Sequence, residues 1–158
     1  MHPNEQTIIN FYQCFKNLDA EGMCACYYDD VVFKDPAFGI LHGERAKHMW
    51  HMLIERGKDS LQIEFDDVEA NGKNGSAKWK ATYLFGKDKR KIVNDVTAHF
   101  VFKDGLIIEH KDVFDLWKWT KQALGLSGAL LWWSNFMKKK VQATTAKTLD
   151  KYIVTKSK

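Results

Sequence analysis

The first part of the chain carries apolar side chains at the spacing of helices. Over residues 8–18 they recur every three or four positions, the period of a helix with one buried face. Asp19 is suited to cap a short second helix that carries Met23 and Tyr27. A third helix is expected between the loop at residues 37–43 and Gly57, with apolar positions at Met49, Trp50, Leu53 and Ile54.

Beyond Gly57 the pattern changes to the period of strands. In strands with one buried face apolar and polar residues alternate, and they do so here over residues 61–65, 77–85, 96–102 and 106–114. Turn signals separate these runs at residues 71–75, 86–90 and 103–105. An earlier short strand, residues 31–35, is ended by Pro36. Helices followed by such a meander predict an α+β fold: a cone-shaped curved sheet, antiparallel or mixed, with the N-terminal helices on its concave face.

Charge divides the chain into two regions. Residues 1–115 carry 15 Lys and Arg against 19 Asp and Glu, a net charge of −4. Residues 116–158 carry nine Lys against the single acid Asp150, a net charge of +8, and they hold four of the six tryptophans. We therefore expect a cone domain over residues 1–115 and a basic, Trp-rich helical extension over residues 116–158.

The extension is expected to form two helices, over residues 116–124 and about 129–153. In the second helix an apolar stripe should pack against the domain or a second subunit, because a lone helix of this kind is marginal in water. The residues of the stripe are Leu130, Trp133, Met137 and Val141. The alternative is peripheral membrane contact through residues 129–140, where Trp132 and Trp133 precede the lysines at 138–140. Nucleic-acid binding has no recognisable motif here, so no nucleic-acid partner is predicted.

Several other classes are excluded. No basic flank followed by an apolar run marks a signal peptide, and no stretch reaches the roughly 20 apolar residues of a spanning helix. Cys14, Cys24 and Cys26 are odd in number, and we interpret them as reduced structural thiols of a cytoplasmic protein. His48 and His51 lie three apart on a helix but lack an identifiable third ligand, so no metal site is predicted.

Three ionisable residues suggest acid–base chemistry. His110 and Asp112 lie two apart in the last strand, so their side chains share a face. Asp35 stands directly before Pro36, where a strand ends and a carboxylate can lie at a rim. An imidazole and two carboxylates around an apolar cavity are the components of a proton-transfer site. The plainer interpretation is a His–Asp hydrogen bond that holds the sheet edge, with Asp35 capping a turn.

The order of elements and one motif also resemble a known family. Over residues 5–115 a Tyr-x-Asp-Asp-x-x-x-x-Asp-Pro run precedes a closing Gly-Leu-Ile strand, and the run consists of Tyr27, Asp29, Asp30, Asp35 and Pro36. This combination resembles the SnoaL-like branch of the nuclear transport factor 2-like superfamily, whose relatives include polyketide cyclases and ketosteroid isomerases. The resemblance implies the cone fold and a homodimer formed through the sheet's outer face. Lys78, Lys80 and Thr82 make that face polar.

The resemblance also implies roles for residues. Asp35 matches the general-base aspartate of the isomerases in its Asp-Pro context, and His110 with Asp112 resembles the acid–base pair of SnoaL-like cyclases. The isomerases' hydrogen-bonding tyrosine falls on Phe11, beside Tyr12, and their protonated aspartate falls near Ala98, so their oxyanion hole is not carried over. This favours aldol-type or proton-shuttle chemistry over steroid isomerisation.

Two functional classes stay open. One is an enzyme without metal or organic cofactor that acts on a hydrophobic carbonyl compound, with Asp35, His110 and Asp112 as catalytic residues. The other is a non-catalytic module that holds a ligand or a protein in the same cone. A third polar group near Asp112 would favour the enzyme, whereas a cone plugged by aromatic rings would favour the module. The expected lining residues are Tyr12, Phe33, Trp50, Trp79, Tyr83, Asn94, Phe100 and Phe114.

Overall fold

The computed structural model describes residues 1–125 and 134–157, and it confirms the α+β fold class. The elements of the described part follow one another along the chain as α1 (Pro3–Lys16), α2 (Ala20–Ala25), β1 (Tyr27–Asp35), β2 (Gly39–His42), α3 (Glu44–Gly57), β3 (Gln62–Ala70), β4 (Asn74–Phe85), β5 (Arg90–Lys103), β6 (Leu106–Val113), α4 (Leu116–Leu124) and α6 (Ser134–Lys156). The loop expected at residues 37–43 is therefore wrong in part, because it contains the short strand β2.

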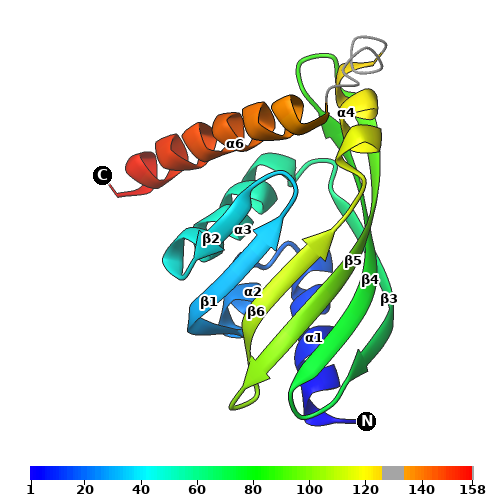
Figure 1. Cartoon of the computed structure of the whole chain (residues 1–158), viewed down its shortest axis with the longest axis vertical. Coiled ribbons are helices and arrows are strands. Elements are labelled where there is room, and N and C mark those ends of the chain that lie inside the picture. The colour runs from blue at the N-terminus through cyan, green and yellow to red at the C-terminus, as the bar shows by residue number, and fades with distance from the viewer. Residues whose placement is uncertain (126–133, 158) are drawn as a thin grey trace.

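The strands form one curved, mixed sheet in the order β2-β1-β6-β5-β4-β3 (Figure 1). Neighbouring strands are antiparallel except β1 and β6, which run parallel. This parallel pair brings the first long strand beside the last one and places Phe33 opposite His110. The two segments that carry the predicted ionisable residues therefore lie side by side.

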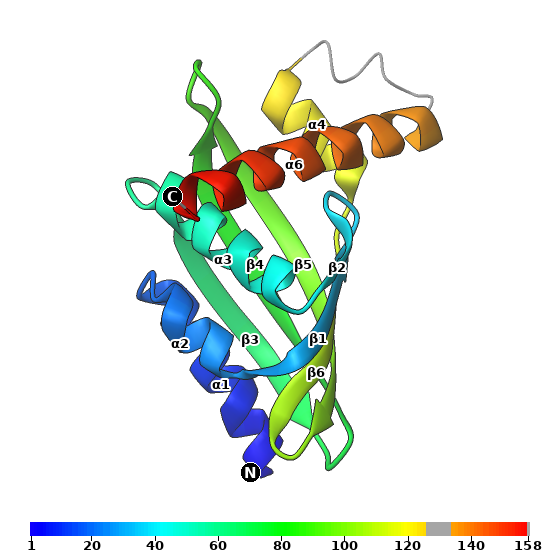
Figure 2. The ribbon, with the colours of Figure 1, turned by 90° about the vertical axis from the view of Figure 1, so that its left-hand side faces the viewer.

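Helices α1, α2 and α3 cover the concave face of the sheet (Figure 2). The first helix starts at a capping box, in which His2 Nδ1 accepts from the Asn4 amide and Glu5 accepts from the His2 amide. The side chain of Asp19 caps α2, as predicted, by accepting from the Gly22 amide. Each helix is thus positioned by a local sequence signal, while burial of its apolar face holds it on the sheet.

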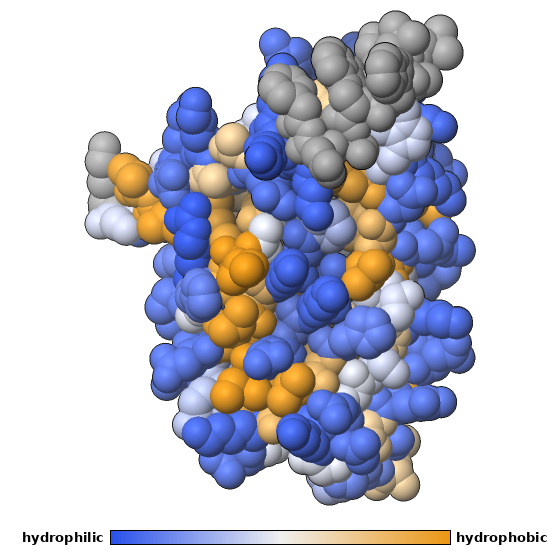
Figure 3. Space-filling view, viewed as in Figure 1, coloured by the Kyte–Doolittle hydropathy of each residue, from blue (hydrophilic) through white to orange (hydrophobic). Residues whose placement is uncertain are grey.

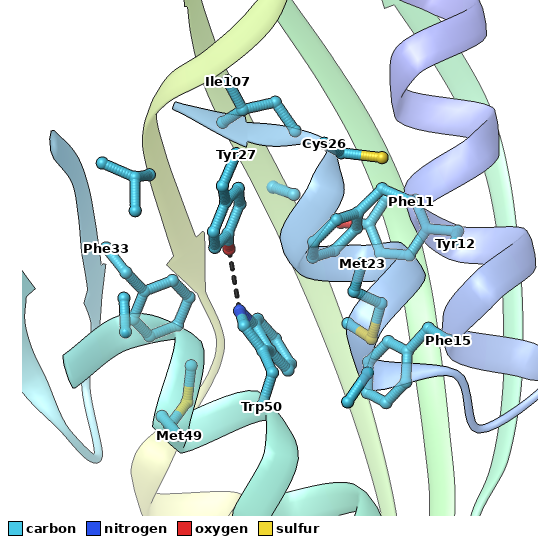
Figure 4. Packing of buried hydrophobic residues seen from close by; sticks show 14 of the residues in the cluster. Phe11, Tyr12, Phe15, Met23, Cys26, Tyr27, Phe33, Met49, Trp50 and Ile107 are labelled. Atoms are coloured by element: carbon cyan, nitrogen blue, oxygen red, sulfur yellow. Dashed lines mark hydrogen bonds between the residues drawn. The ribbon is translucent and has the colours of Figure 1, made fainter. Parts of the chain in front are cut away.

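The core lies between these helices and the inward positions of the strands. The period-two prediction is confirmed on β5, where the side chains of one face are buried: Val96, Ala98, Phe100 and Phe102. His99, on the opposite face, is exposed. Figure 4 shows how the rings of α1 and α3 meet those of β1 inside the cone. The interior is densely aromatic, and ring pairs such as Phe15–Trp50 and Tyr12–Phe65 lie 5.2 and 5.4 Å apart.

The C-terminal helices lie at the end of the sheet where β1 and β6 finish (Figures 1 and 2). Asp115 caps α4, which packs against β5, while α6 packs against α3 and buries Leu149 in the core. In its described part the second helix packs on the domain, as predicted, but the core contacts there come from residues outside the predicted stripe. Met137 and Val141 are only half-buried, and the core contacts come from Leu149, Tyr152 and Ile153. The stripe residues Leu130 and Trp133, together with Trp132, lie outside the described residues.

No helix in the described ranges is long and apolar enough to cross a membrane. The outer face of the sheet is mostly polar, with an apolar strip between charged side chains (Figure 3). Ile40 and Val113, which point outward from β2 and β6, are 56% and 45% exposed. Two lysines of this face have partners within the chain: Lys78 lies 3.1 Å from Asp67 and Lys80 lies 3.7 Å from Asp95.

Candidate functional site

The parallel pairing of β1 with β6 brings two carboxylates together. Phe33 lies opposite His110 and Lys34 opposite Lys111, so the next step of the register sets Asp35 beside Asp112. Both side chains occupy the inward parity of their strands, and the negative charge of Asp112 is among the influences that raise the pKa of Asp35. The structure thus places these residues on the inner face of the sheet, at neighbouring positions near the ends of β1 and β6.

His110 occupies the centre of a buried hydrogen-bonded chain. Its Nε2 lies 2.8 Å from Asp112 Oδ1, and its Nδ1 lies 2.7 Å from the Tyr27 hydroxyl. That hydroxyl accepts from Trp50 Nε1 at 2.8 Å, as the dashed line in Figure 4 shows. The side chains of His110 and Asp112 are only 0% and 2% exposed. The chain therefore links α3, β1 and β6 without contact with bulk water.

The chemistry of each group assigns a donor and an acceptor to the bonds of this hydrogen-bonded network. Since the Tyr27 oxygen accepts from Trp50, its own proton is available for His110 Nδ1. His110 Nε2 donates to Asp112 Oδ1, because a carboxylate oxygen only accepts. With both ring nitrogens occupied, His110 has none left for a ligand. It is placed to orient Asp112.

Aromatic rings surround the imidazole. The centroid of the Phe100 ring lies 4.5 Å from that of His110, and the four other rings lie between 5.2 and 6.0 Å away. These four belong to Phe11, Phe33, Tyr27 and Trp50. Such a cage fixes the ring plane and excludes water, so the bonds to Asp112 and Tyr27 persist in a low-dielectric setting.

Asp112 and Tyr12 each retain unused hydrogen-bonding capacity. Asp112 Oδ1 accepts from His110 and, at 3.3 Å, from Trp79 Nε1, whereas Oδ2 has no partner within the described residues. The Tyr12 hydroxyl is fully buried and has no partner in the described part of the chain. Its pKa is raised well above the ordinary value by burial and then by the charge of Asp112. A buried hydroxyl left unpaired costs about 1–3 kcal/mol, so this one is a candidate for pairing with a ligand.

Asp35 is held differently, by backbone amides. Its Oδ1 accepts from the Ala37 amide at 2.9 Å and from the Phe38 amide at 2.6 Å. Burial and the charge of Asp112 raise the pKa of Asp35 to about 7, and the two amides oppose that rise only in part. The carboxyl group is consequently present in both protonation states near neutral pH.

Tyr83 of β4 carries a further hydroxyl, whose pKa is affected by the charge of Asp35. It accepts from Trp119 Nε1 of α4 at 2.7 Å, so its own proton remains free to donate. Burial raises the pKa of Tyr83, the bond from Trp119 lowers it, and the charge of Asp35 raises it further. The charge of Asp35 thus acts on Tyr83, whose hydroxyl is linked to α4 through Trp119.

The remaining predicted residues contribute less. Asn94 has the inward parity of β5 and is half-buried, while Phe114 lies just beyond the end of β6 and is half-buried too. His48 and His51 lie on α3, and His51 Nε2 is 3.4 Å from Glu21 Oε1. No cluster of three metal-ligating side chains occurs among the residues that the structure covers.

Sequence reasoning missed two members of the site. Tyr27 entered as part of a motif and as a residue of the predicted second helix, but it begins β1 instead and hydrogen-bonds to His110 across 83 positions of the chain. Trp119 carried no signal beyond its place on a predicted helix, and its contact with Tyr83 depends on how α4 docks.

An open hollow of about 660 Å³ lies apart from Asp35 and Asp112, between α2, α3 and α6. Its lining is mainly polar and includes Glu21, Lys47, His48, His51, Glu55 and Lys156. The hollow is therefore not the apolar cone expected from the sequence.

Comparisons with known proteins agree with this architecture. The profile of the SnoaL-like domain family matches residues 8–110. TerC co-crystallised with polyporic acid superposes with a TM-score of 0.66 at 16% identity, covering 77% of this chain and 98% of TerC. A protein from Jannaschia sp. CCS1, provisionally classed as a SnoaL-like polyketide cyclase, gives 0.68 at 14% identity over 78% and 92% of the two chains. An LEH-like epoxide hydrolase from M. tuberculosis gives 0.62 at 20% identity over 82% and 96%.

These identities establish a shared fold and no shared activity. The three structures are covered almost completely, whereas about a fifth of this chain lies outside each superposition. A search of curated proteins finds no match.

Proposed function

Because the chain belongs to the SnoaL-like domain family, we propose that its cone binds a hydrophobic carbonyl compound and transfers a proton within it. The protein would then be a cofactor-free acid–base enzyme of the cyclase or isomerase type. Asp35 and Asp112 would be its catalytic residues, and His110 would position Asp112.

The observation that carries this proposal is the pair of neighbouring carboxyl groups with different surroundings. Asp112 is tied to His110 and Trp79, whereas Asp35 has a pKa of about 7. A general base is most effective when its pKa lies near the working pH, and the charge of Asp112 helps to raise the pKa of Asp35 into that range. Asp35 is also the polar group near Asp112 that the enzyme hypothesis required.

The chemistry follows from these positions. The Asp35 carboxylate removes a proton from the carbon beside the ligand's carbonyl group, and the electron pair of the broken C–H bond forms an enolate. The unpaired Tyr12 hydroxyl, or the Tyr83 hydroxyl, donates to the enolate oxygen. Protonated Asp35 then returns the proton to another carbon, which gives an isomer. In a cyclase the enolate carbon instead attacks a second carbonyl carbon, and the resulting alkoxide takes the proton.

Turnover by variants tests the proposal. On a substrate found by screening hydrophobic ketones and epoxides, Asp35→Asn and Asp112→Asn should each lower turnover by about two to four orders of magnitude, the typical contribution of one acid–base group. His99→Asn is the control, because His99 is exposed on the other face of the sheet. Full activity in both Asp variants would refute the assignment.

A second candidate is a non-catalytic module, favoured by the filled interior. The Trp79 ring packs 5.4 Å from Phe15 and 6.1 Å from Tyr12, so aromatic side chains occupy much of the cone. Such a module would bind a hydrophobic ligand and leave it unchanged. Calorimetric binding with no product after prolonged incubation, equal in the wild type and Asp35→Asn, would favour this function.

We also propose a cytoplasmic homodimer. The free thiols support the location, since burial raises the pKa of Cys24 to about 12 and that of Cys26 to about 11, which suits structural cysteines. The apolar strip in Figure 3 and the exposed side chains of Ile40 and Val113 support an interface on the sheet's outer face. Sedimentation showing a monomer at tens of micromolar, about the range of a weak contact, would count against the dimer.

A further inference from the structure

We propose that α6 belongs to the site, with Gln142 and Thr145 as positioning residues that hold the turn supporting Asp35. The catalytic meaning of this inference rests on the proposed function, but the positioning itself does not.

The contacts act through two peptide units. Gln142 Nε2 donates to the Pro36 carbonyl at 3.1 Å, and the amide on the other side of that peptide bond is Ala37 N–H, which donates to Asp35 Oδ1. Thr145 Oγ1 donates to the Ala37 carbonyl at 2.8 Å and also lies 3.0 Å from the Gln142 carbonyl of its own helix, so the shorter bond goes to the turn. The amide of the Ala37 unit is Phe38 N–H, the second donor to Asp35 Oδ1. Each α6 side chain thus binds the oxygen of a peptide whose nitrogen holds the carboxylate.

Planarity turns these bonds into positioning. A peptide unit is rigid, so fixing the direction of its carbonyl also fixes the direction of its N–H. Hydrogen bonds in a chain also polarise one another, which strengthens the amide as a donor. Gln142 and Thr145 therefore aim the two donors of Asp35 and strengthen them.

The turn ends at Gly39, which lies beside the helix. Gly39 has a φ of +71°, which an L side chain rarely adopts, and a Cβ at this position would meet Gln142 at 3.5 Å. The helix itself is held elsewhere: Leu149 is buried, Asp150 pairs with Arg45 at 2.6 Å, and the Tyr152 hydroxyl donates to Glu55. Removing one contact to the turn should therefore leave α6 in place.

The charges around Asp35 allow the effect to be isolated. The titratable groups near Asp35 are Asp112 of β6 and Tyr83 of β4. The side chains of α6 that contact the turn, Gln142 and Thr145, are uncharged. Trp119 of α4, which binds Tyr83, is uncharged too. The two amides lower the pKa of Asp35. Weakening them while the carboxyl stays buried must raise that pKa.

Gln142 and Thr145 lie outside the matched family region, residues 8–110, whereas the turn that they contact lies inside it. The extension would consequently be a feature that distinguishes this chain from proteins that share only its cone.

The test is a carboxyl NMR titration of the full-length chain without substrate, with Asp35 assigned through Asp35→Asn. Thr145→Val and Gln142→Leu should each raise the pKa of Asp35 by about 0.5 unit or more, since amide bonds to a carboxylate stabilise its charged form. Thr145→Ser keeps the hydroxyl and should restore the wild-type value. Thr144→Val is the matched control, because the Thr144 hydroxyl is exposed and bonds only to Lys140 of its own helix within the described residues.

A purely structural role would lower unfolding free energy in Thr145→Val without moving the pKa of Asp35, and that result would overturn the inference. An equal shift in Thr144→Val would overturn it too. Gln142→Leu reads the second contact independently if Thr145→Val does not fold. Because no substrate is used, failure here leaves the proposed function standing, and an absence of turnover leaves this inference standing.

Discussion

Two regions of the molecule each hold a carboxylate, but by different means. We call the network of His110, Asp112, Tyr27 and Trp50 the wall, and the turn at residues 35–38 the mouth. On the wall, side chains hold Asp112: His110 and Trp79 bind one oxygen, and Tyr27 and Trp50 extend the chain behind His110. At the mouth, backbone amides hold Asp35, in a turn that α6 braces. The first carboxylate is fixed by a packed network, whereas the second depends on how a separate helix docks.

The difference separates geometry from reactivity. The network around His110 uses both ring nitrogens and is closed to water, so it serves orientation. Asp35 lies beside partly exposed groups and has a pKa of about 7, so it can exchange a proton near neutral pH. Acid–base catalysis needs groups that are held in place and a group that can exchange a proton near the working pH, and these two regions would supply them.

The largest expected effect comes from breaking the wall. His110→Ala should lower the unfolding free energy by about 3–5 kcal/mol, because it leaves Asp112 and Tyr27 buried without their partner and opens a cavity. Urea denaturation measures this loss. His99→Ala, on the exposed face of β5, should stay within about 0.5 kcal/mol of the wild type. Equal small effects in both variants would mean that the network carries no stability.

At the mouth, removal of the Asp35 charge should raise the unfolding free energy at high pH, whereas the wall variant lowers it. The pKa of Asp35 is about 7 in the folded chain against 3.8 for the ordinary group. The folded state then binds the proton more tightly, so stability falls as pH rises from about 4 to 7, by at most about 4 kcal/mol. Asp35→Asn removes this fall while its amide oxygen still accepts from the turn. Unfolding at pH 5 and pH 8 should show the variant gaining on the wild type at the higher pH. A constant difference would contradict the raised pKa.

A smaller loss should follow from loosening the helix that braces the mouth. Leu149→Ala removes a buried side chain of α6 and should cost about 2–3 kcal/mol. Val154→Ala on the same helix, at a position that is 57% exposed, should be nearly neutral. If α6 instead detaches to bind membranes, the Leu149 variant would lose little stability. Salt-sensitive co-sedimentation with anionic vesicles would then identify that role.

The wall was more predictable than the mouth for a physical reason. Period-two alternation determines which residues share a face, so the common orientation of His110 and Asp112 followed from two positions of spacing. The parallel pairing of β1 with β6, the bond from Tyr27 to His110 and the docking of α6 join residues that lie far apart in the sequence. Local patterns do not specify such contacts. The apolar period of α6 fades along the helix, so the predicted stripe did not include its core residues Leu149, Tyr152 and Ile153.

The central claim is that burial and the neighbouring Asp112 raise the pKa of Asp35. The most direct test is to measure that pKa by carboxyl NMR titration of the full-length chain, in the wild type and in Asp112→Asn. We expect the wild-type group to titrate near pH 7. In Asp112→Asn the pKa should fall, because a neighbouring negative charge is removed, but it should stay above the ordinary value, because burial is the larger cause. An Asp35 that titrates near pH 4 in both proteins would contradict the account.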